Sequence, residues 1–351
     1  MKQTLVLAGA VAAALMLGGC GHTTPITAGT ATPSPTYSPN VSSEYPITTA
    51  ASQPAGITKT ASALFFTEEA GNKVGVLTQN ATIQDFALPN AGSKPLSITT
   101  DKNGNLWLTE FGGGRIAQFL PSTYGFVECT LPTTYSPAPT PWGIAAGPDG
   151  NLWVTDPASN GIWAIAPGCG SFAFYSLKTA NAGPESITVG PNGALWFVET
   201  NANQIGTIAP GSIASGNPGY VPPAEYPVTT ATAGLGIIIS GADNAVWFTE
   251  TKAARLGRML MTGVMAPTQE TPLTGASAPY GLVLGGDGNY YIGDQGKSTI
   301  IQYITNTGVI NSYPTKTANA GPFWLTLGPD NEVYFTEQTA NQIGQFLYFN
   351  P

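Results

Sequence analysis

The sequence predicts an all-β fold, namely a seven-bladed β-propeller of four-stranded antiparallel blades whose ring is closed by an N-terminal strand. A short phrase occurs seven times, and successive copies lie 42 to 51 residues apart. This period is typical of propeller blades. The strand that would complete the seventh unit is missing at the C-terminal end and has a counterpart near the N-terminus. These two observations predict a closed ring.

The repeated phrase is an apolar run that ends in a carboxylate. Its clearest copy is residues 103–110, an Asn-Gly turn followed by Leu-Trp-Leu-Thr-Glu. Apolar residues at successive positions favour a strand that is buried on both faces, as in blades stacked against their neighbours. The seven copies end at Glu68, Glu110, Asp156, Glu199, Glu250, Asp294 and Glu337.

Each copy lies inside a unit of four short strands. A proline precedes the acid by 15 residues in five units, with Pro54 and Leu235 at the corresponding places of units one and five. We expect an inner strand between this position and the phrase. A third strand is expected from the asparagine four residues after the acid, and a fourth from Tyr-Pro segments such as residues 225–229. The five prolines are Pro95, Pro141, Pro184, Pro279 and Pro322.

The two ends of the chain predict how the ring closes. Residues 345–351 end the seventh unit after its third strand. Residues 44–49, Glu-Tyr-Pro-Ile-Thr-Thr, match the fourth strand of unit five at residues 225–230. We expect the N-terminal segment to pair into the last blade, because closure leaves fewer exposed strand edges. The propeller is then residues 43–351.

Residues 1–20 have the organisation of a secretory signal, with one cation at Lys2 and an apolar run over residues 5–17. This run is too short to favour a membrane span. Leu17-Gly18-Gly19-Cys20 resembles a bacterial lipobox, which implies cleavage before Cys20 and lipidation of that residue. The alternative is an ordinary signal peptide with a nearby cysteine. We therefore expect a lipid-anchored protein of the bacterial cell envelope that faces the periplasm or the exterior.

Residues 21–42 are rich in Thr, Pro and Ser and are predicted to be a disordered tether. The tether contains His22, the only histidine in the chain. Charged residues make up 9% of the sequence and its net charge is -8. No basic stripe is present to neutralise phosphates, which excludes nucleic acid as an expected partner. We expect a monomer that meets the membrane through Cys20.

Cys129 and Cys169 are the two cysteines of the predicted propeller. The repeat pattern places Cys129 in the outer strand of blade two and Cys169 in the outer hairpin of blade three. A secreted protein permits a disulfide between them. Because the pattern leaves their heights on the two blades open, two buried thiols are the simpler interpretation.

Three stretches resemble the repeats of the streptogramin B lyase, or virginiamycin B lyase, family: PWGIAAGPDGNLWVTD, PESITVGPNGALWFVETNANQIGTI and PFWLTLGPDNEVYFTEQTANQIGQF. The resemblance extends over residues 43–351 and implies a seven-bladed propeller. The resemblance also implies an activity, because lyases of that family open a cyclic depsipeptide at its ester by elimination. They use magnesium held by acidic side chains and a histidine as general base. This sequence departs from that pattern, because its propeller contains no histidine. A base with a pKa near 7 suits such a reaction, and a glutamate takes that role only if burial raises its pKa.

The residue after each repeat proline is expected to point toward one mouth of the central channel. Glu185 is the only charged residue at this position. Apolar surface beside a single polar group is what a small-molecule or peptide pocket requires. The alternative is that the aromatic residues plug a dry channel. The other residues at this mouth are Leu96, Trp142, Tyr280 and Phe323, with Trp324 beside Phe323, and the expected ligand site is Trp142, Glu185, Tyr280, Phe323 and Trp324.

Two interpretations compete for the acids that end the phrases. Hard cations take carboxylate oxygens, so a few of them would hold magnesium or calcium, with Glu185, Glu250 and Glu337 as the candidate set. An acid that recurs in every blade instead favours hydrogen bonds from loop backbone, because one site needs only two or three ligands. Three basic residues follow the second-strand loops and either rim the same face, are solvated charges, or pair with these acids: Arg115, Arg255 and Lys297.

The residues exclude several kinds of site. A Ser-His-Asp arrangement is excluded from the propeller, and the cysteines do not have the spacing of a zinc site. We therefore expect a lipid-anchored propeller that binds a small molecule, glycan or peptide at the channel mouth without catalysis. The alternatives are a magnesium-dependent lyase acting on a cyclic depsipeptide, a metal-dependent lactonase, and a scaffold with an exposed apolar patch.

Overall fold

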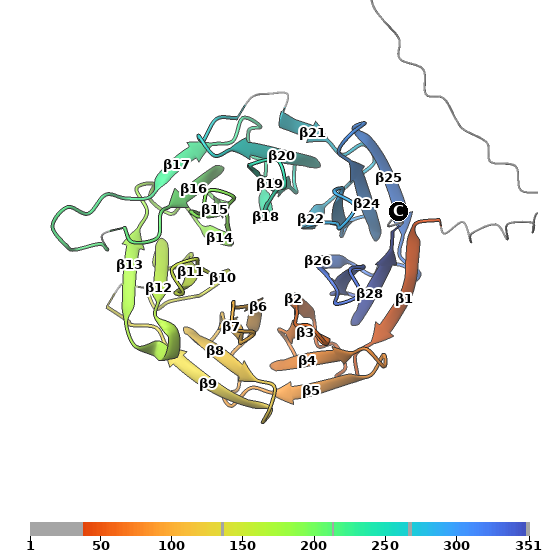
Figure 1. The fold of residues 1–351 in the computed structure, drawn as a ribbon, viewed down its shortest axis with the longest axis horizontal. Helices are drawn as coiled ribbons and strands as arrows, with labels where there is room; N and C mark the ends of the chain where they lie inside the picture. Colours follow the sequence, from red (N-terminus) through yellow and green to blue (C-terminus); the bar gives the residue numbers. More distant parts are fainter. Residues whose placement is uncertain (1–37, 135–136, 213, 266–268, 349–351) are drawn as a thin grey trace, which may run out of the picture. The chain divides into compact units, whose positions relative to one another are not determined.

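A computed structural model describes residues 38–134, 137–212, 214–265 and 269–348. These residues form seven four-stranded antiparallel sheets arranged as a ring, with the first strand of each blade innermost (Figure 1). The predicted fold class is confirmed. In the described part of the chain, no helix is long and apolar enough to cross a membrane.

The strands follow the predicted units from the channel outward. Blades 1 to 3 contain β2 (Pro54–Lys59), β3 (Ala63–Glu68), β4 (Lys73–Thr78) and β5 (Ile83–Ala87); β6 (Pro95–Thr100), β7 (Leu106–Glu110), β8 (Arg115–Leu120) and β9 (Gly125–Thr130); and β10 (Ile144–Ala146), β11 (Leu152–Asp156), β12 (Gly161–Ile165) and β13 (Phe172–Ser176), with the 3-10 turn η1 (Pro167–Cys169) before β13.

Blades 4 to 7 have the same order. They contain β14 (Pro184–Val189), β15 (Leu195–Glu199), β16 (Gln204–Ile208) and β17 (Ala224–Pro227); β18 (Leu235–Ser240), β19 (Ala245–Glu250), β20 (Arg255–Leu260) and β21 (Glu270–Pro272); β22 (Pro279–Leu284), β23 (Tyr290–Asp294), β24 (Thr299–Ile304) and β25 (Val309–Pro314); and β26 (Pro322–Leu327), β27 (Val333–Glu337), β28 (Gln342–Leu347) and β1 (Asn40–Pro46).

The second strand of each blade is buried along its whole length, which explains the apolar phrase. Its aromatic residue packs between blades and turns its polar atom toward the preceding hairpin. The indole of Trp153 donates to Asp149 at 3.2 Å, and the hydroxyl of Tyr334 donates to Asp330 at 2.7 Å. A buried Trp or Tyr needs such an acceptor. The Gly-Pro-Asp-Gly turn and the aromatic residue of the phrase are therefore one structural unit.

The N-terminal strand closes the ring as predicted. β1 pairs antiparallel with β28 and supplies the outer strand of blade 7. The strand begins at Asn40, before the expected boundary at residue 43, and ends at Pro46 before the expected end at residue 49. The chain turns inward after Pro46 because Ile47 is buried against blade 1.

The expectation of two free thiols is wrong. Cys129 of β9 and Cys169 of η1 form a disulfide with a Cα–Cα distance of 5.7 Å. Both residues lie where the repeat pattern placed them. The bridge forms because η1 brings Cys169 to the height of Cys129, and the bridge joins blades 2 and 3. An α-carbon separation of about 4.4 to 6.8 Å is what a disulfide requires.

Candidate functional site

A β-bulge places the residues that follow the repeat prolines at one end of the channel. In six blades the pairing of the inner strand with the second strand shifts register just after the first residue, for example between Pro184 and Ile187. A bulge inserts an extra residue and re-aims its side chain. We call these residues the channel mouth: Ala55, Leu96, Trp142, Glu185, Gly236, Tyr280 and Phe323, together with Trp324.

Four aromatic residues meet at the channel mouth. Trp142 of blade 3 and Trp324 of blade 7 have ring centroids 5.5 Å apart, although these blades are not neighbours. The pair therefore makes contact across the channel. Tyr280 and Phe323 stack at 4.6 Å, and Phe323 meets Trp324 edge-on at 6.0 Å. All four residues are half-buried.

Glu185 lies beside this aromatic cluster. Burial raises the pKa of Glu185, while a hydrogen bond with Thr200 opposes the rise. Burial and the neighbouring Glu185 raise the pKa of Tyr280 well above its usual value. Both groups are therefore held toward their neutral forms, in which each donates a hydrogen bond. The structure thus brings together Trp142, Glu185, Tyr280, Phe323 and Trp324.

Threonines from the preceding blades fix the backbone of the channel mouth. The hydroxyl of Thr109 donates to the carbonyl of Trp142, and that of Thr155 donates to the carbonyl of Glu185. Thr249 donates in the same way to Tyr280 at 2.6 Å. These threonines are the penultimate residues of the repeated phrase. The sequence analysis did not assign them a role, and the signal available was their recurrence beside the acid.

A cavity of about 330 Å³ lies along the channel beyond the two tryptophans. Its wall consists of the deeper residues of the inner strands, including Ser186, Ile238 and Leu284, and Trp324 forms part of it. Asp, Glu, Lys and Arg do not contribute to this wall. The carboxyl group of the site is therefore confined to the channel mouth.

Two of the phrase-ending acids accept hydrogen bonds from loop backbone, as the structural interpretation predicts. Asp156 accepts from the amides of Thr140 and Ser159 at 2.9 and 3.2 Å. Asp294 accepts from the amides of Ser277 and Ala278 at 2.9 and 2.8 Å. Both residues are aspartates, whose short side chains keep the carboxylate beside the loop.

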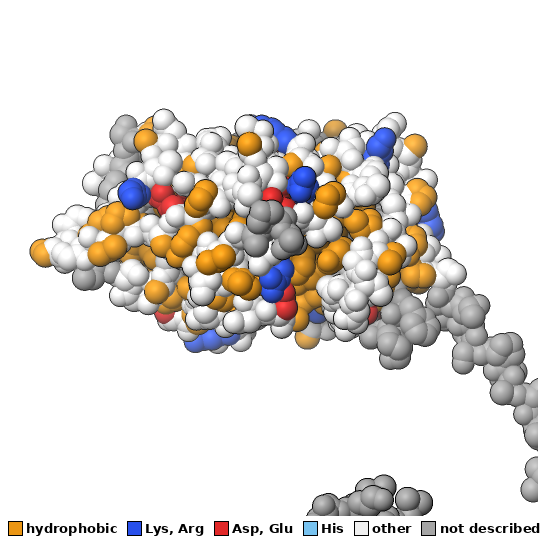
Figure 2. Space-filling view, turned by 90° about the horizontal axis from the view of Figure 1, so that it is seen from above, with side chains coloured by type: hydrophobic (Ala, Val, Ile, Leu, Met, Phe, Trp, Pro, Cys, Tyr) orange, Lys and Arg blue, Asp and Glu red, His pale blue; other side chains and the backbone are white. Residues whose placement is uncertain are grey.

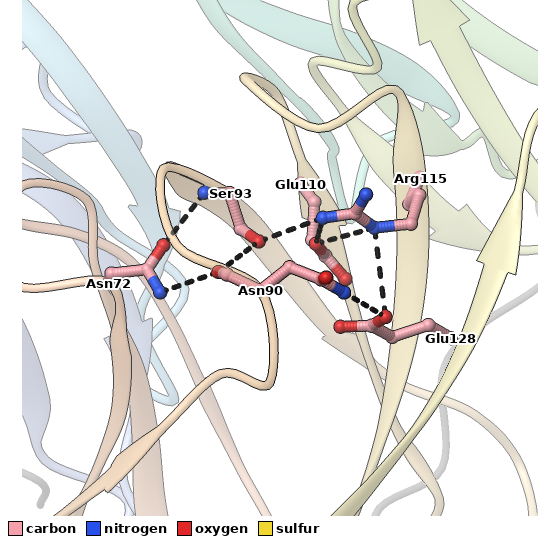
Figure 3. Close-up of polar contacts among 6 residues, drawn as sticks. All are labelled: Asn72, Asn90, Ser93, Glu110, Arg115 and Glu128. Carbon is pink, nitrogen blue, oxygen red and sulfur yellow. Dashed lines mark hydrogen bonds and ion pairs between the residues drawn. The ribbon is translucent and has the colours of Figure 1, made fainter.

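The glutamates that end the phrase have a different environment. Each carries its carboxyl one methylene further, toward an acid on the outer strand of the same blade. In blade 2, the Arg115 guanidinium lies 2.7 Å from Glu110 and 3.7 Å from Glu128 (Figure 3). Arg115 also donates to Ser93 in the loop that leads into this blade. Loop backbone is therefore not the main partner of these glutamates, and the prediction is wrong for them.

Four buried glutamates have strongly raised pKa values. Burial is the main cause, and the acid on the outer strand adds to it. The pKa rises to about 8 for Glu68, Glu199 and Glu337 and to about 7 for Glu250. The outer acids are Asp85, Glu225, Glu44 and Glu270, and the residues at the start of the third strands are Lys73, Gln204, Gln342 and Arg255.

The three glutamates predicted to hold magnesium or calcium do not meet at one point. Glu250 and Glu337 lie at the ends of strands in blades 5 and 7, whereas Glu185 lies at the channel mouth. Within the described ranges, no three Asp, Glu, His or Cys residues are placed to hold a metal ion together. These residues do not fit a magnesium or calcium ion shared by the three carboxylates. We therefore derive no chemical step through such an ion.

The three basic residues expected near this face differ in their partners. Arg115 pairs with repeat acids, and Arg255 lies close enough to lower the pKa of Glu250 and donates to the carbonyl of Glu270 at 3.3 Å. Lys297 is exposed. The interpretation of these residues as partners of the repeat acids is confirmed for Arg115, whereas Arg255 makes its hydrogen bond to a backbone carbonyl.

The ring and its channel mouth define a β-propeller with a candidate small-molecule site on its axis. The chain belongs to the Virginiamycin B lyase family, whose model matches residues 36–144 and 211–348. The resemblance stated from the repeats is confirmed.

Individual relatives agree with this assignment. The chain is 34% identical to virginiamycin B lyase of Nocardia farcinica over 104 residues, which are 30% of this chain and 34% of that protein. The match thus spans about a third of the relative's length. A streptogramin B lyase structure is 28% identical with a TM-score of 0.78, over 87% of this chain and 96% of that chain. A catalytically inactive histidine-to-alanine variant of Staphylococcus aureus virginiamycin B lyase, solved with quinupristin, is 26% identical with a TM-score of 0.78, over 88% of this chain and 99% of that chain.

Proposed function

We propose that this protein binds a ring-bearing small molecule, glycan or peptide at the channel mouth without cleaving it. The observation that carries the proposal is the meeting of four aromatic rings and one carboxyl, from blades 3, 4, 6 and 7, at one end of the channel. Aromatic rings supply contact area with little loss of side-chain entropy, and a single polar group fixes orientation.

The absence of catalysis is argued from the residues available as a base. The histidine-to-alanine variant of the Staphylococcus aureus virginiamycin B lyase is catalytically inactive. The one histidine of this chain is His22, which lies outside the described residues and outside the predicted propeller. A positioned general base contributes about a hundredfold to ten-thousandfold to a reaction rate. The lack of a histidine in the propeller therefore favours binding without cleavage.

Quinupristin is the first probe, because it occupies a solved relative of the same fold. Titration should quench tryptophan fluorescence, since Trp142 and Trp324 lie at the channel mouth. Trp142→Leu should weaken binding by about tenfold, the equivalent of roughly 1.4 kcal/mol. Tyr124→Leu is the matched control, because Tyr124 is 53% exposed on an outer hairpin. Equal weakening by both substitutions, or no saturable response to quinupristin, peptides or glycans, contradicts the proposal.

A residual lyase activity is the second candidate, and family membership favours it. Burial raises the pKa of Glu185, as the base of such an elimination would require. Incubation of the protein with quinupristin and magnesium, followed by mass spectrometry, separates the two functions. Intact quinupristin, together with saturable binding in the fluorescence titration, supports binding without catalysis. Linear product that Glu185→Gln abolishes supports the lyase.

We propose in addition that lipidated Cys20 anchors the protein in the cell envelope. The proposal rests on the lipobox of residues 17–20, which lie outside the described residues. Asn40 pairs with Leu347, at the end of blade 7 remote from the channel mouth. The closing strand β1 therefore begins at the face of the propeller opposite the channel mouth. Cys20→Ser should release the protein from the membrane fraction. Mass spectrometry should then detect no acylated form of the variant.

A scaffold function has less support. The large apolar side chains that are exposed in the described residues are spread over blades 2, 4, 5 and 6: Tyr124, Val127, Val221, Val264 and Val309. On the edge of the ring shown in Figure 2, hydrophobic side chains alternate with other side chains and backbone, and a few charged side chains lie among them. Scattered apolar residues of this kind are normal for a protein surface.

A further inference from the structure

A pocket of about 270 Å³ lies between blades 7 and 1, where the ring closes. We call it the seam pocket and define it by Tyr45, Leu64, Leu77, Asp330 and Tyr334. Tyr45 comes from the closing strand β1, while Leu64 and Leu77 belong to β3 and β4 of blade 1. The seam pocket is separate from the channel mouth, because none of its lining residues belongs to an inner strand.

The seam pocket has an apolar floor and a polar end. Leu64 and Leu77 are 3% and 4% exposed. The Tyr334 hydroxyl donates to Asp330 at 2.7 Å, and the Tyr45 hydroxyl donates to Gln345 at 2.9 Å. Gln345 in turn lies 3.4 Å from Asp330. The polar atoms of both tyrosines are thus gathered on the side of Asp330, and their rings face the apolar part.

The polar end carries an excess of negative charge. Asp330 is exposed, and no ion pair joins it to a Lys or Arg among the residues that the structure describes. Asp330 and Asp287 both contribute to raising the pKa of Glu332, after the larger effect of burial. The Lys59 amine donates to the carbonyl of Gly328 at 3.0 Å rather than to a carboxylate. A cation placed beside Asp330 would therefore meet uncompensated charge.

The seam pocket differs from the equivalent places between other neighbouring blades. An aromatic residue occupies the place of Tyr45 in four other blades, each opposite the second residue of the third strand. In three seams the connection between the third and fourth strands of the next blade covers it. Phe86 stacks with Tyr124 at 4.4 Å, the Tyr175 hydroxyl donates to Ser212, and Tyr226 packs against Gly263. The fourth, Tyr313, packs on Phe346.

Blade 1 offers no such cover to Tyr45. Its third and fourth strands are joined by a tight turn in which Ala81 donates to Thr78 and Thr78 donates to Thr82. The residues between them are Gln79, Asn80 and Ala81, which are all exposed and include no large apolar side chain. The ring of Tyr45 therefore lines an open pocket, where equivalent rings are covered by another part of the chain.

We propose that the seam pocket binds a small organic cation, an amine whose ring or alkyl body lies on the leucines and tyrosines and whose ammonium group faces Asp330. Tyrosine rings attract ammonium groups through their electron-rich faces. The apolar floor provides contact area that a metal ion would not use. The carboxylate and the two rings together select a positive charge on an apolar body.

Phenethylammonium is the probe, and uncharged 2-phenylethanol is its control. We expect saturable binding of the amine to the full chain, measured by ligand-observed NMR, and at least tenfold weaker binding of the alcohol. Asp330→Asn should weaken amine binding about tenfold, and Tyr45→Leu should also weaken it. Asp149→Asn is the matched variant, because Asp149 occupies the equivalent place in the hairpin of blade 3 and accepts from the indole of Trp153.

Unchanged amine binding in Asp149→Asn, together with weakened binding in Asp330→Asn, supports the proposal. Equal binding of amine and alcohol overturns it, as does amine binding that Asp330→Asn leaves unchanged. Absence of amine binding to the unmodified protein overturns it as well. Thermal unfolding of each variant checks that a folded protein was measured, and Tyr45→Leu provides a second arm if Asp330→Asn unfolds.

Discussion

The asparagines that precede the third strands show how a single residue joins two blades. Asn72, Asn160, Asn203 and Asn341 have φ values of 53° to 61°. This left-handed conformation suits asparagine better than most residues. In blade 4, the Asn203 side chain donates to the carbonyl of Thr230 at 2.9 Å and accepts from the amide of Ala233 at 2.8 Å. One amide group thus holds the loop that leads into the next blade.

Replacement of Asn203 separates the contribution of its side-chain hydrogen bonds from that of its left-handed backbone conformation. Asn203→Ala should lower the free energy of unfolding by about 2 to 3 kcal/mol, since two hydrogen bonds contribute about 1 kcal/mol each and alanine is strained at positive φ. Asn203→Gly loses the hydrogen bonds without the strain and should cost about 1 kcal/mol less than alanine. Urea unfolding measures both. Equal losses for the two variants would show that the backbone conformation contributes nothing.

Elements outside the regular repeat tie neighbouring blades together at the rim. The insertion after β16 crosses to blade 3, where the amide of Ser215 donates to the carbonyl of Phe174 and Tyr220 contacts the carbonyl of Ser176. It thereby covers β13, which would otherwise be an open edge strand. The disulfide between Cys129 and Cys169 joins blades 2 and 3 on the opposite side of blade 3. Blade 3 is thus fastened to both neighbours.

The disulfide makes the stability of the propeller sensitive to reduction. The bond closes a chain segment with a sequence separation of 40 residues. In the chain-entropy model, a loop of this length stabilises the folded state by about 4 kcal/mol. Reduction, or the double change Cys129→Ala and Cys169→Ala, should lower the urea midpoint accordingly. The same midpoint with and without reductant would contradict a bridge in the folded protein.

At the scale of the molecule, the fold was predictable from the sequence, and the site only in part. The seven-fold repeat and the match between residues 44–49 and 225–230 were sufficient for the ring. The proline spacing also located the channel mouth. The contact between Trp142 and Trp324 was not predictable, because it crosses the ring between blades far apart in sequence. The disulfide was missed because the short turn η1, which sets the height of Cys169, has no counterpart in the repeat.

The buried carboxyl pairs follow a pattern that the acid of the phrase alone did not reveal, because each partner lies on another strand. Glu225 accepts hydrogen bonds from the backbone amides of Lys178 and Thr179. Its neighbour Glu199 has no hydrogen-bond partner on either carboxylate oxygen and a pKa raised to about 8. Glu199 is therefore mostly protonated near neutral pH.

Stability should consequently fall as the pH rises. A glutamate with a pKa near 4.5 in the unfolded chain and about 8 in the fold is protonated only in the folded state between these values. Its stabilising contribution is complete below about pH 4.5 and is lost as the pH rises to about 8, at roughly 1.4 kcal/mol per pH unit for each retained proton. Four residues take part, namely Glu68, Glu199, Glu250 and Glu337.

The pH dependence can be assigned to particular pairs by removing their protons. Glu199→Gln and Glu337→Gln together place a neutral amide where the fold holds a neutral acid, opposite Glu225 and Glu44. The melting temperature of the unmodified protein should decrease steadily from pH 5 to pH 8. That of the double variant should decrease less and should exceed the unmodified value at pH 8, because the variant folds without taking up those two protons. Parallel curves for the two proteins would mean that both glutamates are ionised in the folded state.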